Sequence, residues 1–180
     1  MKENDILTGA AMKRKIVFVI FLALLVAWMS VIFGFSANDA EKSTDQSNVV
    51  TELFLKIFSP GFEELDAEAQ KELISRYDGP VRKLAHFASY AALAFLMYFT
   101  VGSIHDLPFK VFRAAFISLP ICVLFAVGDE YHQTFVDGRA GQLMDVVIDS
   151  GGSLLGIATA IAISLVVMKL IGKKQAKRAQ

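Results

Sequence analysis

Long apolar runs alternate with shorter polar segments along the chain. The runs cover residues 16–35, 85–104, 111–128 and 146–168. The first run carries no charge, and the last carries only Asp149. A helix needs about 20 predominantly apolar residues to cross a bilayer core. The pattern therefore predicts an all-α integral membrane protein, a four-helix bundle that forms one domain over residues 1–180.

The segment between the first two runs, residues 36–82, is too polar to cross a membrane and predicts an external lid. Its apolar residues recur on one side of a helix in two places, at Val49, Val50, Leu53, Phe54, Ile57 and Phe58, and again at Leu65, Ala69, Leu73 and Tyr77. A single apolar stripe is typical of a helix that lies in the membrane interface. We expect two amphipathic interfacial helices here, the first ending at Ser59-Pro60-Gly61 and the second at Asp78-Gly79-Pro80.

The composition agrees with a membrane protein and narrows its function. Hydrophobic residues make up 54% of the chain, charged residues 20%, and the mean hydropathy is +0.49, which is more apolar than a typical soluble domain. Lys plus Arg equals Asp plus Glu, at 18 each, so no overall field favours nucleic acid as a partner. The lone cysteine, Cys122, excludes a disulfide framework and a cysteine-based metal site.

The basic residues predict the orientation of the chain in the membrane. With the N-terminus inside, the cytoplasmic segments hold eleven of the 18 Lys and Arg residues and leave seven outside. The external segments, around residues 39–78 and 129–149, are acidic. Cytoplasmic loops of membrane proteins carry the excess of Lys and Arg. We therefore expect a multi-pass protein with both termini in the cytoplasm.

Polar side chains gather at the outer ends of three predicted spans. They are Arg82, Lys83, His86 and Tyr90 on the second span, Asp129, Glu130, His132, Gln133 and Arg139 at and after the end of the third, and Asp145 and Asp149 on the fourth. An ionisable group at the centre of a span costs about 2.5–3.5 kcal/mol on insertion scales and indicates function by default. We interpret this set as one site at the outer face.

Helical spacing orders these residues further. Lys83, His86 and Tyr90 share one helix face, and Asp145 and Asp149 lie one turn apart. The row that begins with the two aspartates continues as Gly152, Gly156, Ala160 and Ser164. Small residues at every fourth position predict close packing against another helix.

At these residues the sequence resembles the VanZ-like family of bacterial membrane proteins. The resemblance is carried by RKLAHFASYAALAF from Arg82 and DEYHQTFVDGRAGQLMDVVIDSGGSLLG from Asp129, and more weakly by Ser36, Ser43 and Ser47 after the first span. Asp149 departs from the family, which favours Asn there. The resemblance implies a cell-envelope protein of the bacterial cytoplasmic membrane that contributes to resistance against the lipoglycopeptide teicoplanin.

The first functional hypothesis is a binding protein. It would bind or shield a lipid-linked wall precursor, or the lipoglycopeptide itself, among the membrane lipids of the outer leaflet. Arg82, Lys83 and Arg139 would pair with phosphate or carboxylate groups. The remaining binding residues would be His86, Tyr90, Gln133, Asp145 and Asp149, while Asp129, Glu130 and His132 would hold the pocket and hydrogen-bond sugar or peptide.

Two alternatives stay open. In a membrane-embedded hydrolase or transferase, Glu130 and His132 would act as base and acid beside Asp129, or His86, Glu130 and His132 would hold a divalent metal that activates water. The chain has no H-E-x-x-H motif and no nucleophile elbow to support either scheme. The second alternative is a small transporter or flippase in which buried Asp, Glu and His relay protons. With four spans, that activity would require an oligomer.

Overall fold

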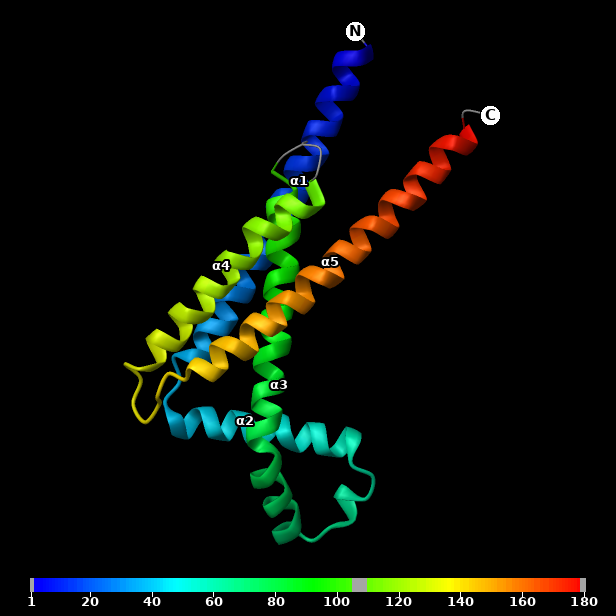
Figure 1. The fold of residues 1–180 in the computed structure, drawn as a ribbon. Helices are drawn as coiled ribbons and strands as arrows, with labels where there is room; N and C mark the ends of the chain where they lie inside the picture. Colours follow the sequence, from blue (N-terminus) through cyan, green and yellow to red (C-terminus); the bar gives the residue numbers. More distant parts are fainter. Residues whose placement is uncertain (1, 105–109, 179–180) are drawn as a thin grey trace.

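The computed structural model describes residues 2–104 and 110–178, and within these ranges the elements are helical (Figure 1). They are α1 (Lys2–Ser36), α2 (Ala40–Phe58), the short 3₁₀ helix η1 (Phe62–Glu64), α3 (Ala67–Gly102), α4 (Lys110–Gln133) and α5 (Leu143–Arg178). Four of them, α1, α3, α4 and α5, are long and apolar enough to cross a membrane. The all-α class and the four candidate spans predicted from the sequence are therefore confirmed.

Helix α3 is the centre of the bundle. It packs against α1, α4 and α5, and α2 lies across it near one end (Figure 1). The core is built from small, aliphatic and aromatic side chains, among them Tyr90, Leu93 and Ala94 of α3, Cys122 and Ala126 of α4, and Ala160 of α5. The outward faces of the long helices carry exposed apolar residues such as Phe116 and Leu124. A surface of this kind suits contact with lipid.

The contact between α3 and α5 depends on glycine. A Cβ atom on Gly152 would overlap the carbonyl oxygen of Phe87, and one on Gly156 would overlap the carbonyl oxygen of Ala91. The two backbones therefore meet directly at these positions, as small residues in membrane helices allow. The close packing predicted for this row is confirmed at both glycines.

One predicted boundary is wrong. The stripe through Leu73 and Tyr77 does not end at Asp78-Gly79-Pro80, because α3 continues through Pro80 to Gly102 as one helix. The lid therefore contains one separate long helix, α2, and the predicted second helix is the first part of α3. Pro80 removes one backbone hydrogen bond, but the ion pair between Asp78 and Arg82 spans this turn at 2.9 Å. Val81, the next residue, is buried.

Helix α2 defines the end of the bundle that holds the polar residues. Its N-terminus is capped by Asp39, whose side chain accepts from the backbone N–H of Lys42 at 2.8 Å. The loop of residues 134–142 lies beside this start, where Ala40 donates to the carbonyl of Asp137 at 3.2 Å. Helix α1 begins and α5 ends at the opposite end of the bundle (Figure 1). That the outer apolar residues of α2 lie in a membrane interface stays a prediction.

Candidate functional site

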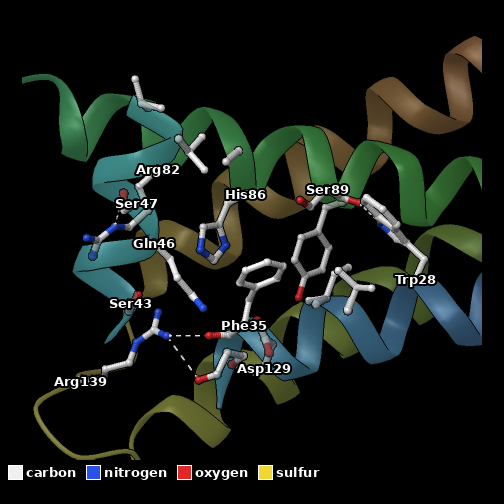
Figure 2. Close-up of a pocket in the computed structure, with 17 residues that line it drawn as sticks. Trp28, Phe35, Ser43, Gln46, Ser47, Arg82, His86, Ser89, Asp129 and Arg139 are labelled. Carbon is white, nitrogen blue, oxygen red and sulfur yellow. Dashed lines mark hydrogen bonds between the residues drawn. The ribbon is translucent and has the colours of Figure 1, made fainter. Parts of the chain in front are cut away.

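Two adjoining cavities lie at the α2 end of the bundle. Each has a volume of about 290 Å³, at the lower end of the range for small-molecule sites. Both are lined by the same four side chains, Ser43, Arg82, His86 and Arg139. We call these four residues the neck, the cavity among α1, α2 and α3 the inner chamber, and the cavity beside the 134–142 loop the outer chamber. Figure 2 shows the inner chamber and the neck.

The inner chamber has an apolar wall. This wall is formed by Trp28, Val31 and Ile32 of α1, Val50 of α2 and Val81 of α3. The Trp28 indole N–H donates to the carbonyl of Ser89 at 2.9 Å, which holds the ring against α3 (Figure 2). An apolar surface beside a polar neck is suited to the hydrocarbon part of a ligand.

The outer chamber is polar and carries both signs of charge. Besides the neck, its charged or amide-bearing side chains are Asp78, Lys83, Gln133, Gln142 and Asp145. Lys83 is exposed, whereas Gln133 is buried. This chamber offers donors and acceptors to a headgroup, while the inner chamber offers mainly carbon.

Arg82 is held in the neck by contacts on its own helix and on α2. Its Nη2 atom lies 2.9 Å from Asp78 Oδ2, and its Nε atom donates to Ser47 Oγ at 3.4 Å. Ser47 in turn donates to the second oxygen of Asp78. These contacts fix the direction of the guanidinium and use part of its five-donor set. The remaining donors are available at the neck.

Arg139 reaches the neck from the 134–142 loop and contacts the C-terminus of α1. Its Nη1 atom lies 3.4 Å from the carbonyl oxygen of Phe35, 3.3 Å from that of Ser36 and 3.5 Å from that of Asn38 (Figure 2). A cation is favourable there because the last carbonyls of a helix are unpaired and partly negative. Within the described residues, no carboxylate forms an ion pair with Arg139.

The electrostatics at Arg139 favour an anion in the neck. Burial lowers the pKa of the Arg139 guanidinium, and the positive charge of Arg82 lowers it further. Asp129, Glu130 and Asp145 act in the opposite direction but do not offset these effects. Two guanidinium groups that line the same space and repel each other are stabilised by an anion between them.

His86 joins the neck to a buried acid on α5. Its Nδ1 atom lies 3.6 Å from Asp149 Oδ1, and the Asp149 side chain is fully buried. The ring itself projects into the inner chamber (Figure 2). Asp149 lines neither chamber, so its contact with the site passes through His86. A carboxylate on one ring nitrogen orients an imidazole and leaves the other nitrogen for a ligand.

Asp129 and Tyr90 supply unpaired polar atoms to the inner chamber. Asp129 is only 5% exposed, and Tyr90 is fully buried. Neither Asp129 oxygen, nor the Tyr90 hydroxyl, has a hydrogen-bond partner among the described residues. Buried polar groups are normally paired. The inner chamber therefore combines an apolar wall with a carboxylate and a hydroxyl that form no hydrogen bond among the described residues.

Glu130 has a different environment. Its Oε2 atom accepts from the backbone N–H of Gln142 at 2.8 Å, and its Oε1 atom lies 3.4 Å from Gln133 Nε2. A Cβ on Gly141 would overlap the carbonyl oxygen of Glu130, so the loop approaches α4 closely here. These contacts tie the loop that carries Arg139 to the end of α4. Glu130 lines neither chamber, and its catalytic role stays a prediction.

His132 is also turned away from the chambers. Its ring packs against Phe33 of α1 with centroids 4.8 Å apart, and it lines neither cavity. In the parts of the chain that the structure describes, no three His, Cys, Asp or Glu side chains are placed together as metal ligands would be. His86, Glu130 and His132, the predicted ligand set, therefore do not form a common site in this arrangement.

The structure brings most of the predicted site residues together. Those that line one or both chambers are Arg82, Lys83, His86, Tyr90, Asp129, Gln133, Arg139 and Asp145. Asp149 lies behind His86, and Glu130 and His132 face elsewhere. The site also includes residues that were not proposed for it, namely Trp28, Ser43, Gln46 and Ser47. The last three share one face of α2 at i, i+3 and i+4, and this polar face was the available signal.

Four long apolar helices around a buried polar site define the class of a multi-pass helical membrane protein. Within this class, the chain belongs to the VanZ/LLP1 family, whose family model matches residues 21–167. The matched range contains every residue of both chambers. No curated protein and no solved structure matches the chain.

Proposed function

We propose that this VanZ-like envelope protein binds an amphiphile whose phosphate or carboxylate group lies in the neck. The observation that carries the proposal is the convergence of Arg82 and Arg139 on a space between an apolar and a polar chamber. Arg pairs with phosphate and carboxylate groups through two parallel hydrogen bonds. The hydrocarbon part would lie against Trp28, Val31 and Ile32, and the rest of the headgroup would lie among the polar side chains beside the neck.

Two features of the bundle support a ligand that arrives from the membrane. The inner chamber lies among helices that are apolar enough to cross a bilayer, and α2, which also lines the chamber, carries exposed apolar residues. A lipid in the leaflet at the α2 end would reach the chamber without leaving the membrane. The proposed orientation, with both termini in the cytoplasm, makes this the outer leaflet.

The amphiphilic site suits a role in resistance to teicoplanin. A lipid-linked wall precursor carries phosphate next to a hydrocarbon chain, and a lipoglycopeptide such as teicoplanin is also an amphiphile. Binding or shielding either molecule at the outer face would contribute to teicoplanin resistance. The family membership and the amphiphilic character of the two chambers support this role.

Native mass spectrometry of the gently extracted protein tests the proposal. We expect a co-purified amphiphile with an acidic group on the wild type, and roughly tenfold lower occupancy on Arg139→Gln, because charge-assisted hydrogen bonds contribute about 1.5–3 kcal/mol. Arg113→Gln is the matched control, since Arg113 is exposed and lines neither chamber. Equal occupancy in the wild type and Arg139→Gln would contradict the proposal.

A membrane-embedded hydrolase or transferase is a second candidate, favoured by one contact. The 3.6 Å approach of Asp149 to His86 resembles the acid–imidazole pair that orients a general base, and His86 lines both chambers beside the two arginines. The discriminating variant is His86→Gln. If amphiphile binding persists while turnover of a bound lipid is lost, the site is catalytic.

A further inference from the structure

The inner chamber contains one carboxylate that the proposed anion site does not explain. Asp129 is 5% exposed, and both of its oxygens lack a hydrogen-bond partner. Glu130, the next residue, is equally buried but accepts from Gln142, and Asp149 faces His86. Among these three buried acids, Asp129 is the one that forms neither a hydrogen bond nor an ion pair within the described chain, although Arg139 and the Tyr90 hydroxyl act on it electrostatically.

Among the described residues, no cation of the chamber forms an ion pair with Asp129. Arg82 is paired with Asp78, and Arg139 is turned to the carbonyl groups of α1. The other polar atom beside the apolar wall is the Tyr90 hydroxyl, which is also unpaired. A buried carboxylate without a hydrogen bond or an opposite charge is strongly unfavourable. A ligand that supplies a donor and a positive charge would therefore stabilise this carboxylate.

We infer that the ligand is a zwitterionic lipid in which a primary ammonium group lies near the phosphate. The inference rests on the proposed function, because the phosphate is assigned to Arg82 and Arg139. The ammonium then donates to Asp129, beside the Tyr90 hydroxyl. The hydrocarbon chain lies along Trp28 and its neighbours.

The unpaired oxygens of Asp129 and Tyr90 distinguish ammonium groups by the number of N–H donors that they carry. Carboxylate and phenol oxygens accept hydrogen bonds, and a primary ammonium has three N–H donors. A quaternary ammonium carries the same charge but has no N–H, so it leaves both Asp129 oxygens unsatisfied. An uncharged polyol headgroup offers donors without the counter-charge. The site thus prefers an ethanolamine-type headgroup to a choline-type or glycerol-type headgroup.

The test uses the full-length protein and lipids that differ only in the headgroup. Native mass spectrometry is run on the protein in detergent with an equimolar mixture of phosphatidylethanolamine, phosphatidylcholine and phosphatidylglycerol that share the same acyl chains. We expect the ethanolamine lipid to be retained about tenfold over the choline lipid, the size of a charge-assisted hydrogen bond. Equal retention of these two lipids would overturn the inference.

Three aspartate variants assign the preference to one residue. Asp129→Asn should reduce the ethanolamine-to-choline ratio to near one, with phosphatidylglycerol still bound. Asp45→Asn is the matched control, because Asp45 is exposed and lines neither chamber, and it should keep the wild-type ratio. Asp145 has an unpaired oxygen in the outer chamber. If Asp145→Asn removes the preference and Asp129→Asn does not, the assignment to Asp129 is overturned.

A second measurement needs no variant and stays informative if Asp129→Asn fails to fold. The wild type is offered ethanolamine, N-methyl, N,N-dimethyl and choline lipids in turn. Affinity should fall most at choline, where the last N–H is lost, and equal affinity for all four lipids would contradict the hydrogen bond. If the proposed anion site at Arg82 and Arg139 is itself wrong, Arg139→Gln will leave the retention of all these lipids unchanged.

Discussion

The contact of α3 with α5 and the chamber end of the same bundle are built in opposite ways. At the contact, the backbones of Gly152 and Gly156 approach α3 so closely that no added carbon fits. At the chamber end, two cavities of about 290 Å³ each lie side by side, and Asp129 and Tyr90, which line the inner chamber, have unpaired polar atoms. The comparison shows that the bundle packs tightly where glycines allow it and leaves space at its polar end, which makes this end the place for a ligand.

The largest effect is expected at the close contact. Gly156→Ala places a Cβ on the carbonyl group of Ala91, and overpacking of this kind costs about 1–3 kcal/mol. The thermal unfolding midpoint in detergent should fall clearly. Gly172→Ala, further along α5 with no atom within 4 Å of the added carbon, should be neutral or slightly stabilising, because Ala favours helix more than Gly by about 1 kcal/mol. Equal midpoints for the two variants would contradict the close packing.

At the chamber end, a substitution that fills space should lower ligand binding rather than stability. Ser43→Leu fills the neck shared by both chambers, and we expect about tenfold lower lipid occupancy, equivalent to about 1.4 kcal/mol, with little change in the unfolding midpoint. Ser30→Leu, at an exposed position of α1 outside both cavities, is the control. Normal lipid occupancy in Ser43→Leu would show that the neck is not the binding site.

A smaller effect is expected at Glu130, which ties the loop that carries Arg139 to the end of α4. Glu130→Gln keeps the size of the side chain but weakens its bond to the N–H of Gln142, a loss of about 1 kcal/mol in the free energy of unfolding. Lipid occupancy should change less than about twofold, below 0.5 kcal/mol. A variant that folds and binds normally but loses turnover of a bound lipid would instead support the catalytic interpretation of Glu130.

The smallest effect is expected at the rim of the outer chamber. Lys83 is exposed there and forms no ion pair within the described residues, so Lys83→Gln should lower lipid affinity less than about threefold. The difference should shrink further at high salt, because exposed charges are screened. Lipid titrations at two ionic strengths measure both quantities. A large loss that salt does not reduce would place Lys83 in the binding site proper.

The hydrophobic pattern predicted the fold well because membrane spans depend on local sequence. Four apolar runs gave four long helices, and the glycine row on α5 predicted a close contact. The boundary at Asp78-Gly79-Pro80 failed because local stop signals were opposed by tertiary contacts. Asp78 pairs with Arg82 across the proline and accepts a hydrogen bond from Ser47 of α2. Helical spacing cannot predict the contacts of Ser47 with Asp78 and Arg82, because they join two different helices.

The candidate site was only partly predictable for the same reason. Helical spacing placed Lys83, His86 and Tyr90 on one face, and all three line the chambers. Spacing could not show that Glu130 turns to Gln142 or that His132 turns to Phe33, because these directions depend on how the helices and the loop meet. The serines and Gln46 of α2 were overlooked as site residues because small polar side chains on a polar helix face are ordinary in a surface helix.

The most direct test of the central claim is photo-crosslinking with a lipid that carries a diazirine in its acyl chain. In vesicles, the label should concentrate on peptides of the inner chamber that contain Trp28, Ile32 and Val50, and excess unlabelled lipid should remove it. Peptides with Phe116 and Leu124, which are exposed to bulk lipid and line neither chamber, should take only background label, in proportion to the mole fraction of the probe. Labelling spread evenly over all exposed apolar residues, with no competed component at the inner chamber, would contradict the account.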